Sequence, residues 1–444
     1  MFRGLAIAAL FVVPVPGALA QCPATATWRT LVGGSNLSPV GVHPLQTRSF
    51  VSSPTTRRVE ALDDEAGTFA VAYSAPSLGA GVESYPMVVR LSNGTWRVFV
   101  AARDGRVYAI DAGTGTVLWS RDLRRPTCSA DTLTAPPAIV LRSVCASYAA
   151  CAMPAGASGP DTDIVVVGTR FACGTFGSET SSNAVVALRA DTGFPVWIFN
   201  LTRTDRVDYI SEGAALDYSR NRIYVGTGRR VSVDNSLFAL AITTGAKLWA
   251  RNVGRIETTP KLSYNATLTS RLYVATLQGT VRAVRPDNGA DVWSPATVSV
   301  GGPVSVNLGY RGQSTAIGDR LFAVAPLSGT VSAIRDNGGS ATLLWTLTPS
   351  GHFGGALAKS APAIYESSTT GVRALYVGMS DGTVRQIRPP EAATALGATI
   401  TSRLVDPGGG IVGDALVDLS SAFGSPRLMV GDNAGYVSRW CIPW

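Results

Sequence analysis

The chain has 444 residues, of which 38 are Lys or Arg and 30 are Asp or Glu, so its formal net charge is +8 at pH 7. This basic surplus is spread thinly, with no run longer than pairs such as Arg124-Arg125, which excludes the concentrated basic surface of a nucleic-acid-binding protein. With 47 glycines, 46% hydrophobic residues and only 15% charged residues, the composition suits many short strands joined by tight turns.

The N-terminal segment predicts an exported protein. The apolar run from Leu5 to Val13 and the small residues 18–20 are typical of a secretory signal peptide over residues 1–20, with cleavage before Gln21. No stretch of the chain reaches the roughly 20 apolar residues of a membrane helix. Cys22 leaves a lipid-anchored alternative open, because a bacterial lipobox also ends in Cys, although Gln21 is not the small residue that normally precedes it. We expect a secreted protein, or a periplasmic one in a bacterium, without a membrane span.

A strand-turn-strand unit recurs along the rest of the chain. Its copies share a glycine four residues before a tryptophan: Gly115 and Trp119, Gly193 and Trp197, Gly245 and Trp249, Gly289 and Trp293. Glycine supplies the positive φ that a tight hairpin needs, and we expect the following strand to carry the tryptophan inward against the neighbouring unit. A shorter apolar segment, such as residues 135–140 or 361–365, opens each unit and gives it a further strand.

Four-stranded units, with strands A to D, that repeat every roughly 40 to 50 residues are typical of the blades of a β-propeller. We therefore expect an all-β fold, an eight-bladed propeller that forms a single domain over residues 21–444. The first blade is a degraded copy with Val71 at the tryptophan position. The last blade lacks its fourth strand, and the segment 24–32 with Trp28 is expected to supply it and close the ring. The blades are expected near residues 36–78, 83–123, 132–202, 210–254, 257–300, 312–349, 358–404 and 410–441.

The repeat has a recognisable consensus, Tyr-Val-Gly-x-x-Asp-Gly-x-Val-Tyr-Ala-Ile-Asp-Ala-x-Thr-Gly-x-x-x-Trp, carried best by residues 98–119 and 375–388. It resembles the pyrroloquinoline-quinone (PQQ) repeat. That family includes PQQ-dependent alcohol dehydrogenases, polyvinyl-alcohol-dehydrogenase-like proteins and a non-enzymatic propeller lipoprotein of the bacterial outer-membrane assembly machine. The resemblance covers nearly all of the mature chain and implies the fold, but enzymes and scaffolds share it, so it does not decide the function.

The residues that catalysis would need are missing from the sequence. The quinoprotein enzymes of this family hold PQQ between a tryptophan floor and a disulfide of adjacent cysteines, with a bound Ca²⁺, and this chain has no adjacent cysteine pair. Six of its nine tryptophans fall at the packing position of strand D. His43 and His352 are the only histidines, which excludes a His-rich metal site and disfavours a Ser-His-Asp triad. We expect no catalytic residues and no cofactor, PQQ and Ca²⁺ being required only by a quinoprotein alternative.

Six cysteines in an exported chain predict disulfides. In a propeller the D-to-A and B-to-C connections lie on one face, and the A-to-B and C-to-D connections lie on the other. Cysteines that share a face and a blade can then pair, and free buried thiols are the alternative. The predicted pairs are Cys22 with Cys441, Cys128 with Cys173, and Cys145 with Cys151.

Four Asn-x-Ser/Thr sequons map to blade connections or strand ends. In a eukaryotic secretory pathway they would be surface glycosylation sites, and in a bacterium they carry no meaning. They begin at Asn36, Asn93, Asn200 and Asn265.

The face where strands A begin is the candidate ligand-binding site, because binding residues concentrate on loops held by a rigid scaffold. Aligning the blades on the proline that opens strand A places Glu83, Thr134, Glu257 and Lys359 at the mouth of a central channel, and looser matches add Glu212, Ser314 and Asp414. The connection 346–357, with His352, enlarges the same face. Four carboxylates around one opening could hold Ca²⁺ or a cationic ligand, and a solvated ring of polar strand ends is the alternative.

The sequence thus favours a secreted, non-enzymatic PQQ-repeat propeller, expected to be a monomer, that binds a protein or glycan through its loop-rich face. Two other functions stay open. One is a PQQ-dependent quinoprotein oxidoreductase of the polyvinyl-alcohol-dehydrogenase type, and the other is a periplasmic scaffold for outer-membrane assembly.

Overall fold

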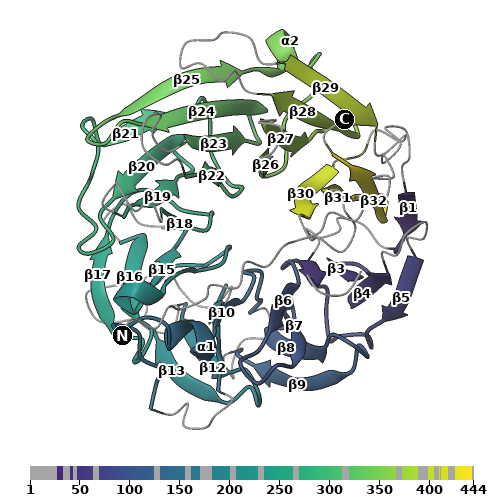
Figure 1. Ribbon diagram of the computed structural model, residues 1–444, viewed down its shortest axis with the longest axis vertical. Helices are drawn as coiled ribbons and strands as arrows, with labels where there is room; N and C mark the ends of the chain where they lie inside the picture. Colours follow the sequence, from purple (N-terminus) through teal and green to yellow (C-terminus); the bar gives the residue numbers. More distant parts are fainter. Residues whose placement is uncertain are drawn as a thin grey trace, which may run out of the picture.

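Eight four-stranded antiparallel sheets stand around one axis in the computed structural model, with strand A of each sheet nearest the axis and strand D outermost (Figure 1). The predicted all-β, eight-bladed propeller is confirmed. The residues that the structure describes are 28–33, 41–43, 48–63, 70–124, 131–155, 162–170, 183–200, 207–228, 235–263, 270–312, 320–366, 373–388, 399–404, 410, 412–418 and 426–442.

The first seven blades each use four consecutive strands, in the order A to D. Blades 1 to 4 contain β2 (Gly41–His43), β3 (Arg48–Ser53), β4 (Arg58–Asp63) and β5 (Ala70–Ser74); β6 (Met87–Arg90), β7 (Trp96–Ala101), β8 (Arg106–Asp111) and β9 (Val117–Asp122); β10 (Ala138–Val140), β11 (Ile164–Gly168), β12 (Val185–Arg189) and β13 (Pro195–Phe199); and β14 (Ala215–Asp217), β15 (Arg222–Gly226), β16 (Leu237–Ala241) and β17 (Lys247–Arg251). Blades 5 to 7 contain β18 (Lys261–Leu262), β19 (Leu272–Ala275), β20 (Thr280–Val284) and β21 (Thr297–Ser299); β22 (Gly309–Arg311), β23 (Arg320–Ala325), β24 (Thr330–Asp336) and β25 (Ala341–Leu347); and β26 (Ala363–Glu366), β27 (Arg373–Gly378), β28 (Thr383–Arg388) and β29 (Thr399–Leu404).

Blade 8 joins the two ends of the chain, as predicted. Its strands A to C are β30 (Val412–Asp418), β31 (Arg427–Asp432) and β32 (Tyr436–Cys441), and β1 (Trp28–Leu31) adds the fourth strand antiparallel to β32. Next to Trp28, the guanidinium of Arg29 lies 2.9 Å from the buried carboxylate of Asp432 and 3.7 Å from the ring centre of Tyr436. The seam is therefore held by an ion pair and a cation–π contact as well as by the strand ladder.

The hydrophobic core lies between neighbouring blades. One cluster, for example, joins Val166 of blade 3 to Ile223 and Phe238 of blade 4. Strands B and C are covered on both faces, so β11 is buried at every position, whereas β17 at the outer edge has no fully buried residue. Continuous apolar runs in strands B and C are what such two-sided burial requires.

The repeated aromatic residue of strand D reaches across to the next blade. The indole N–H donates to a backbone carbonyl just after strand C of that blade, from Trp119 to Ala190 at 3.0 Å, from Trp197 to Ile242 at 2.9 Å and from Trp249 to Pro286 at 2.9 Å. An aromatic ring that is packed on one side and hydrogen-bonded at its polar end is well suited to fix two sheets against each other.

The repeated glycine belongs to the same contact. The predicted positive φ is present, at +76° for Gly115, +71° for Gly193 and +70° for Gly289. The structure adds a second reason for glycine, because a Cβ at Gly193 would stand 2.6 Å from the Trp119 ring of the preceding blade. The glycine therefore has two roles. It allows the turn of its own hairpin, and it leaves space for the tryptophan ring of the preceding blade.

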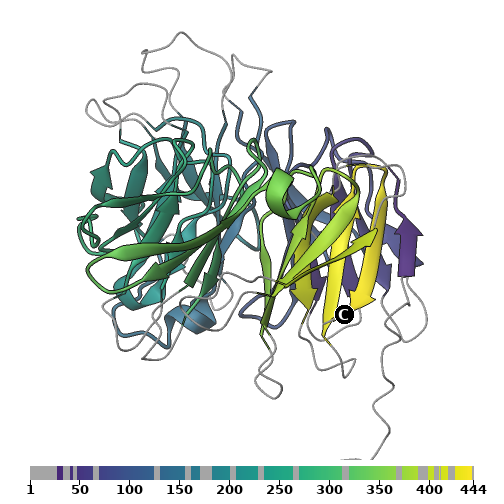
Figure 2. The same ribbon diagram turned by 90° about the horizontal axis from the view of Figure 1, so that it is seen from above.

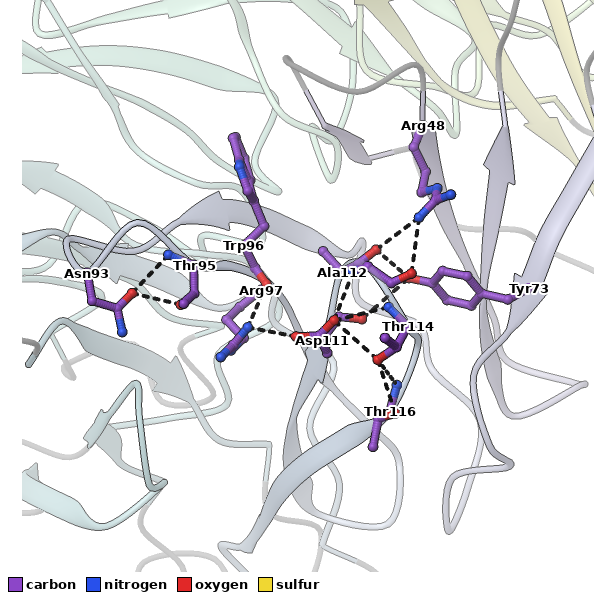
Figure 3. A network of polar contacts seen from close by, with 11 residues as sticks. Arg48, Tyr73, Asn93, Thr95, Trp96, Arg97, Asp111, Ala112, Thr114 and Thr116 are labelled. Atoms are coloured by element: carbon purple, nitrogen blue, oxygen red, sulfur yellow. Dashed lines mark hydrogen bonds and ion pairs between the residues drawn. The ribbon is translucent and has the colours of Figure 1, made fainter.

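The predicted alignment of the first blade was wrong by two residues, because Tyr73 and not Val71 stands at the tryptophan position. Tyr73 pairs with Ala61 beyond a register shift, as Trp119 pairs with Ala109. Its hydroxyl donates to the carbonyl of Ala112 at 2.8 Å, the counterpart of the indole bonds in the other blades (Figure 3). The alignment failed because a tyrosine replaces the indole in this blade, and because the sequence does not reveal the register shift between β4 and β5.

Short helical turns decorate the ring. They are α1 (Arg142–Cys145), which lies on the lower face in Figure 2, α2 (Pro349–His352) and the 3-10 turn η2 (Tyr218–Arg220). No helix within the described ranges is long and apolar enough to cross a membrane.

The predicted Cys145–Cys151 disulfide is present, with the two Cα atoms 5.2 Å apart. Cys441 is also disulfide-bonded. Cys22, Cys128 and Cys173 lie outside the described residues. The other two pairings therefore stay predictions.

The double role of the glycine can be tested with a matched pair of substitutions. Gly354 has a φ of +63°, close to the +71° of Gly193, but a Cβ there would meet nothing within 4 Å. Gly354→Ala should cost about 1–2 kcal/mol through backbone strain alone. Gly193→Ala should lose about 1–3 kcal/mol more because its Cβ overpacks the Trp119 ring. Urea denaturation followed by tryptophan fluorescence measures the difference, and equal losses would contradict the interlock.

Candidate functional site

In six blades a short segment before strand A lies near the axis and is placed by the preceding blade. One backbone N–H of this segment donates, at 3.0–3.3 Å, to the carbonyl at the end of strand B of the blade before it. These equivalent bonds run from Val82 to Ser53, Leu133 to Ala102, Ile210 to Thr169, Ile256 to Thr227, Val304 to Thr276 and Val412 to Met379. Counting from each donor therefore aligns the blades without reference to sequence similarity.

Glu83, Thr134 and Glu257 stand at the first position after the donor, as the proline alignment predicts. Glu83 accepts a hydrogen bond from Arg103 of the same blade. Lys359 donates from Nζ to the carbonyl of Pro326 at 2.7 Å. Glu83 and Lys359 are thus bound within the protein, so the predicted mouth residues do not form one ring of free carboxylates.

Glu257 belongs to a group that we call the mouth cluster, made of Arg170, Tyr209, Arg255 and Glu257. The Tyr209 hydroxyl donates to the Glu257 carboxylate and accepts from Arg255 Nη2 at 2.8 Å. The guanidinium of Arg170 lies 5.3 Å from the ring centre of Tyr209. Arg255 keeps 44% of its side chain exposed, so the cluster presents ordered guanidinium groups to solvent.

Glu212 and Asp414 stand one residue further along than the sequence alignment placed them. At this second position Ser84 and Thr258 use their hydroxyls to bond the backbone of their own strand B. A carboxylate at the same place in blades 4 and 8 is instead bonded by groups of other blades. The off-by-one alignment arose because these two blades lack the proline that aligns the rest.

The contacts of Glu212 show that it reaches the axis. Its Oε2 accepts from Asn307 Nδ2 at 3.1 Å, and Asn307 Oδ1 in turn accepts from the backbone N–H of Thr259 at 2.7 Å. Glu212 precedes strand A of blade 4, Thr259 that of blade 5 and Asn307 that of blade 6. A hydrogen bond that passes across an intervening blade is possible only where the blades converge.

Four titratable residues from four blades act on one another at this point, and we call them the axial cluster: Tyr85, Glu212, Lys261 and Asp414. Asp414 is fixed by the backbone N–H of Ala361, which donates to Oδ1 at 2.5 Å. Glu212 and Asp414 come from blades 4 and 8, on opposite sides of the ring, yet the charge of Asp414 affects Glu212. All four residues keep part of their surface exposed, but their titrating groups are almost fully surrounded by protein.

Burial dominates the electrostatics of the axial cluster. It raises the pKa of Glu212 to about 7, the hydrogen bond from Asn307 partly offsets this rise, and the charge of Asp414 adds to it. Burial also raises the pKa of Asp414 and of Tyr85, and it lowers the pKa of Lys261. Each ionised form is disfavoured because the axis supplies less hydration than bulk water.

Sequence reasoning missed Tyr85, Lys261 and Asn307. Tyr85 directly precedes Pro86 and Lys261 directly follows Pro260, so they flank the prolines used for the alignment. Polar residues on either side of those prolines, in an otherwise apolar strand A, were the available signal. Asn307 has no such proline beside it.

Several predicted site residues lie apart from the axis. His352 ends α2 at the outer edge of the ring (Figure 1), where its Nδ1 accepts from the backbone N–H of Thr348 at 3.1 Å. Ser314, Asn36 and Asn265 fall outside the described residues. Asn93 and Asn200 are exposed. The structure therefore does not bring His352 together with the other predicted mouth residues.

The described residues do not provide the PQQ arrangement of the quinoprotein enzymes. The indoles of Trp119, Trp197 and Trp249 bond neighbouring blades through strand D and do not floor the axis. No group of three or more His, Cys, Asp or Glu residues in the described part of the chain could hold a metal ion.

The raised pKa of Glu212 predicts a particular dependence of stability on pH. Between pH 4.5 and about 7 the folded protein binds this proton more tightly than the unfolded chain, so stability should fall as the pH rises through that window and then level off. Glu212→Gln keeps an oxygen for Asn307 but removes the titration. As the pH rises across this window, the free energy of unfolding of Glu212→Gln should therefore increase by about 2–3 kcal/mol relative to that of the wild type.

Urea denaturation at a series of pH values measures this effect. Glu257→Gln is the matched control, because Glu257 lies outside the axial cluster, and its stability should follow the wild-type slope. Parallel curves for the wild type and Glu212→Gln would contradict the assignment.

The comparisons with known proteins agree with this architecture. The family described as outer membrane protein assembly factor BamB matches residues 25–212 and 153–388. The comparison with curated protein sequences gave no match.

Three solved structures illustrate the likeness. BamB from Moraxella catarrhalis is 19% identical, with a TM-score of 0.56 over 94% of this chain and 98% of that one. A europium-containing methanol dehydrogenase is 14% identical, with a TM-score of 0.63 over 91% and 84% of the two chains. The quinohemoprotein alcohol dehydrogenase from Comamonas testosteroni is 14% identical, with a TM-score of 0.60 over 94% and 76%. At these identities the three structures show the fold alone, but the family match spans most of the sequence. The chain therefore belongs to the PQQ-like β-propeller family described as outer membrane protein assembly factor BamB.

Proposed function

We propose that this protein is an exported, non-catalytic scaffold that binds a protein partner through the face carrying the mouth cluster. The observation that carries the proposal is a pair of exposed arginines on that face, Arg170 and Arg255, which the buried Tyr209 holds in place. Arginine is enriched in binding hot spots of protein interfaces. Side chains already held in place lose less conformational entropy on binding, so this surface is favourable for recognition.

Two further features support the proposal. The Cys145–Cys151 disulfide is typical of proteins in an oxidising compartment, which favours export to the periplasm or outside the cell. Arg103 and Arg255 pair with Glu83 and Glu257, whereas Arg170 pairs with no carboxylate among the described residues, so this part of the rim has an excess of one positive charge. Such a surface favours a partner with acidic groups.

Partner capture tests the mouth cluster. The disulfide-intact protein is immobilised and incubated with the exported fraction of its own cells, and it is expected to retain a partner. The double variant Arg170→Ala/Arg255→Ala should retain at least about tenfold less of that partner. Arg189→Ala is the matched control. Arg189 also pairs with a carboxylate, that of Asp191, but it lies at the hairpin between strands C and D of blade 3 and not in the mouth cluster. Quantitative mass spectrometry of the three eluates gives the measurement.

Two outcomes would contradict this function. One is equal retention by all three proteins. The other is stoichiometric binding of added PQQ and Ca²⁺ together with dye-linked alcohol oxidation, which would identify a quinoprotein oxidoreductase.

A role in outer-membrane protein assembly is a narrower second candidate, favoured by the family match. If it holds, deleting the gene from the bacterium that produces the protein should lower the amount of β-barrel proteins in its outer membrane. Restoring the wild-type gene should reverse the loss, and the Arg170→Ala/Arg255→Ala gene should not. Unchanged β-barrel levels after deletion would rule out this candidate while leaving partner binding open.

A further inference from the structure

The axial cluster contains charged groups of both signs that the protein does not pair directly. Among the described residues, Lys261 Nζ forms no ion pair with Glu212 or Asp414, although the charges of both carboxylates act on it. The Tyr85 hydroxyl likewise has no hydrogen-bond partner among the described residues. An ammonium, a phenol and two carboxyl groups therefore act on one another near the axis.

The scaffold keeps these groups from collapsing onto one another. Glu212 is tied to Asn307, and Asp414 is tied to the backbone N–H of Ala361. Lys261 is the first residue of β18 and is held by the pairing of that strand with β19. Opposite charges in a poorly hydrated place attract strongly, so keeping them apart leaves interaction energy available to a molecule that bridges them.

The signs of the charges decide which kind of molecule fits. A simple cation would gain from the two carboxyl groups but would be repelled by Lys261. A simple anion would gain from Lys261 and Tyr85 but would be repelled by Glu212 and Asp414. A molecule with a positive and a negative end satisfies both sets, and charge-assisted hydrogen bonds are the strong ones in such sites.

We propose that the axial cluster binds a small zwitterion, with its ammonium group between Glu212 and Asp414 and its carboxylate at Lys261 and Tyr85. This inference goes beyond the proposed function, because it concerns residues at the axis rather than the mouth cluster. Four blades supply the four groups, so a bound zwitterion would also tie opposite sides of the ring together.

Calorimetry with matched probes tests the proposal. The zwitterions are glycine, β-alanine and γ-aminobutyrate, and the single-charge probes are propylamine and propionate. The full-length mature protein is expected to bind at least one zwitterion at least about tenfold more tightly than either single-charge probe.

Charge removal should switch the preference. Lys261→Met should lower the affinity for the zwitterion by about tenfold or more. Propylamine should then bind more tightly than the zwitterion, because the repelling ammonium is gone. The double variant Glu212→Gln/Asp414→Asn should lower the affinity for the zwitterion similarly. Propionate should then bind more tightly than the zwitterion, because the repelling carboxyl groups are gone. Both amides keep the oxygen that accepts from Asn307 or Ala361, so the site keeps its shape. Denaturation midpoints confirm that each variant is folded.

The control variant is Glu257→Gln, which changes the mouth cluster and should leave zwitterion affinity unchanged. Equal affinity for all probes, tighter binding of a single-charge probe by the wild type, or no binding of any zwitterion at millimolar concentration would overturn the proposal. None of these results bears on partner capture, which depends on Arg170 and Arg255. Failure of either idea is thus recognised separately.

Discussion

The contact between an aromatic ring of one blade and a glycine of the next sets the spacing of this ring. Trp119 lies against Gly193 and donates to Ala190, and the same combination recurs at Trp197 and Trp249. The glycine has no Cβ, so the ring approaches the backbone closely enough to make its hydrogen bond. Because the contact sits on the outer strand, it holds the wide side of each wedge-shaped gap, and the apolar clusters fill the gap behind it.

The repetition of this contact in strand D explains why the sequence predicted the outer part of the molecule well. The glycine and tryptophan recur at a fixed spacing because every blade needs the same contact, so the repeat, the number of blades and the fourth strand supplied by Trp28 could all be read from the chain. The misalignment in strand D, Val71 for Tyr73, came where a tyrosine fills the place of the indole. Its phenol makes the same bond to the next blade, but no indole marks the place in the sequence.

The axis was predicted less well, for a physical reason. Residues that meet there come from blades far apart in the sequence, and nothing in a single repeat shows that Glu212 will reach Asn307 or act on Asp414. The alignment on prolines located Glu83 and Glu257, which stand at the same position of their blades, and missed Lys261, which acts on carboxyl groups of two other blades. A polar residue that departs from the repeat is informative for function, but its partners appear only when the ring is assembled.

Ring closure has a consequence for the order of folding. The hydrogen bond from Arg29 to Asp432 joins residues 403 positions apart, and β1 finds its place only on β32. The N-terminal strand must therefore wait, unpaired, until nearly the entire chain has emerged and the preceding blades have stacked. Until then the growing assembly presents an open sheet edge, so a chain cut short before β32 would keep that edge and be prone to join other copies.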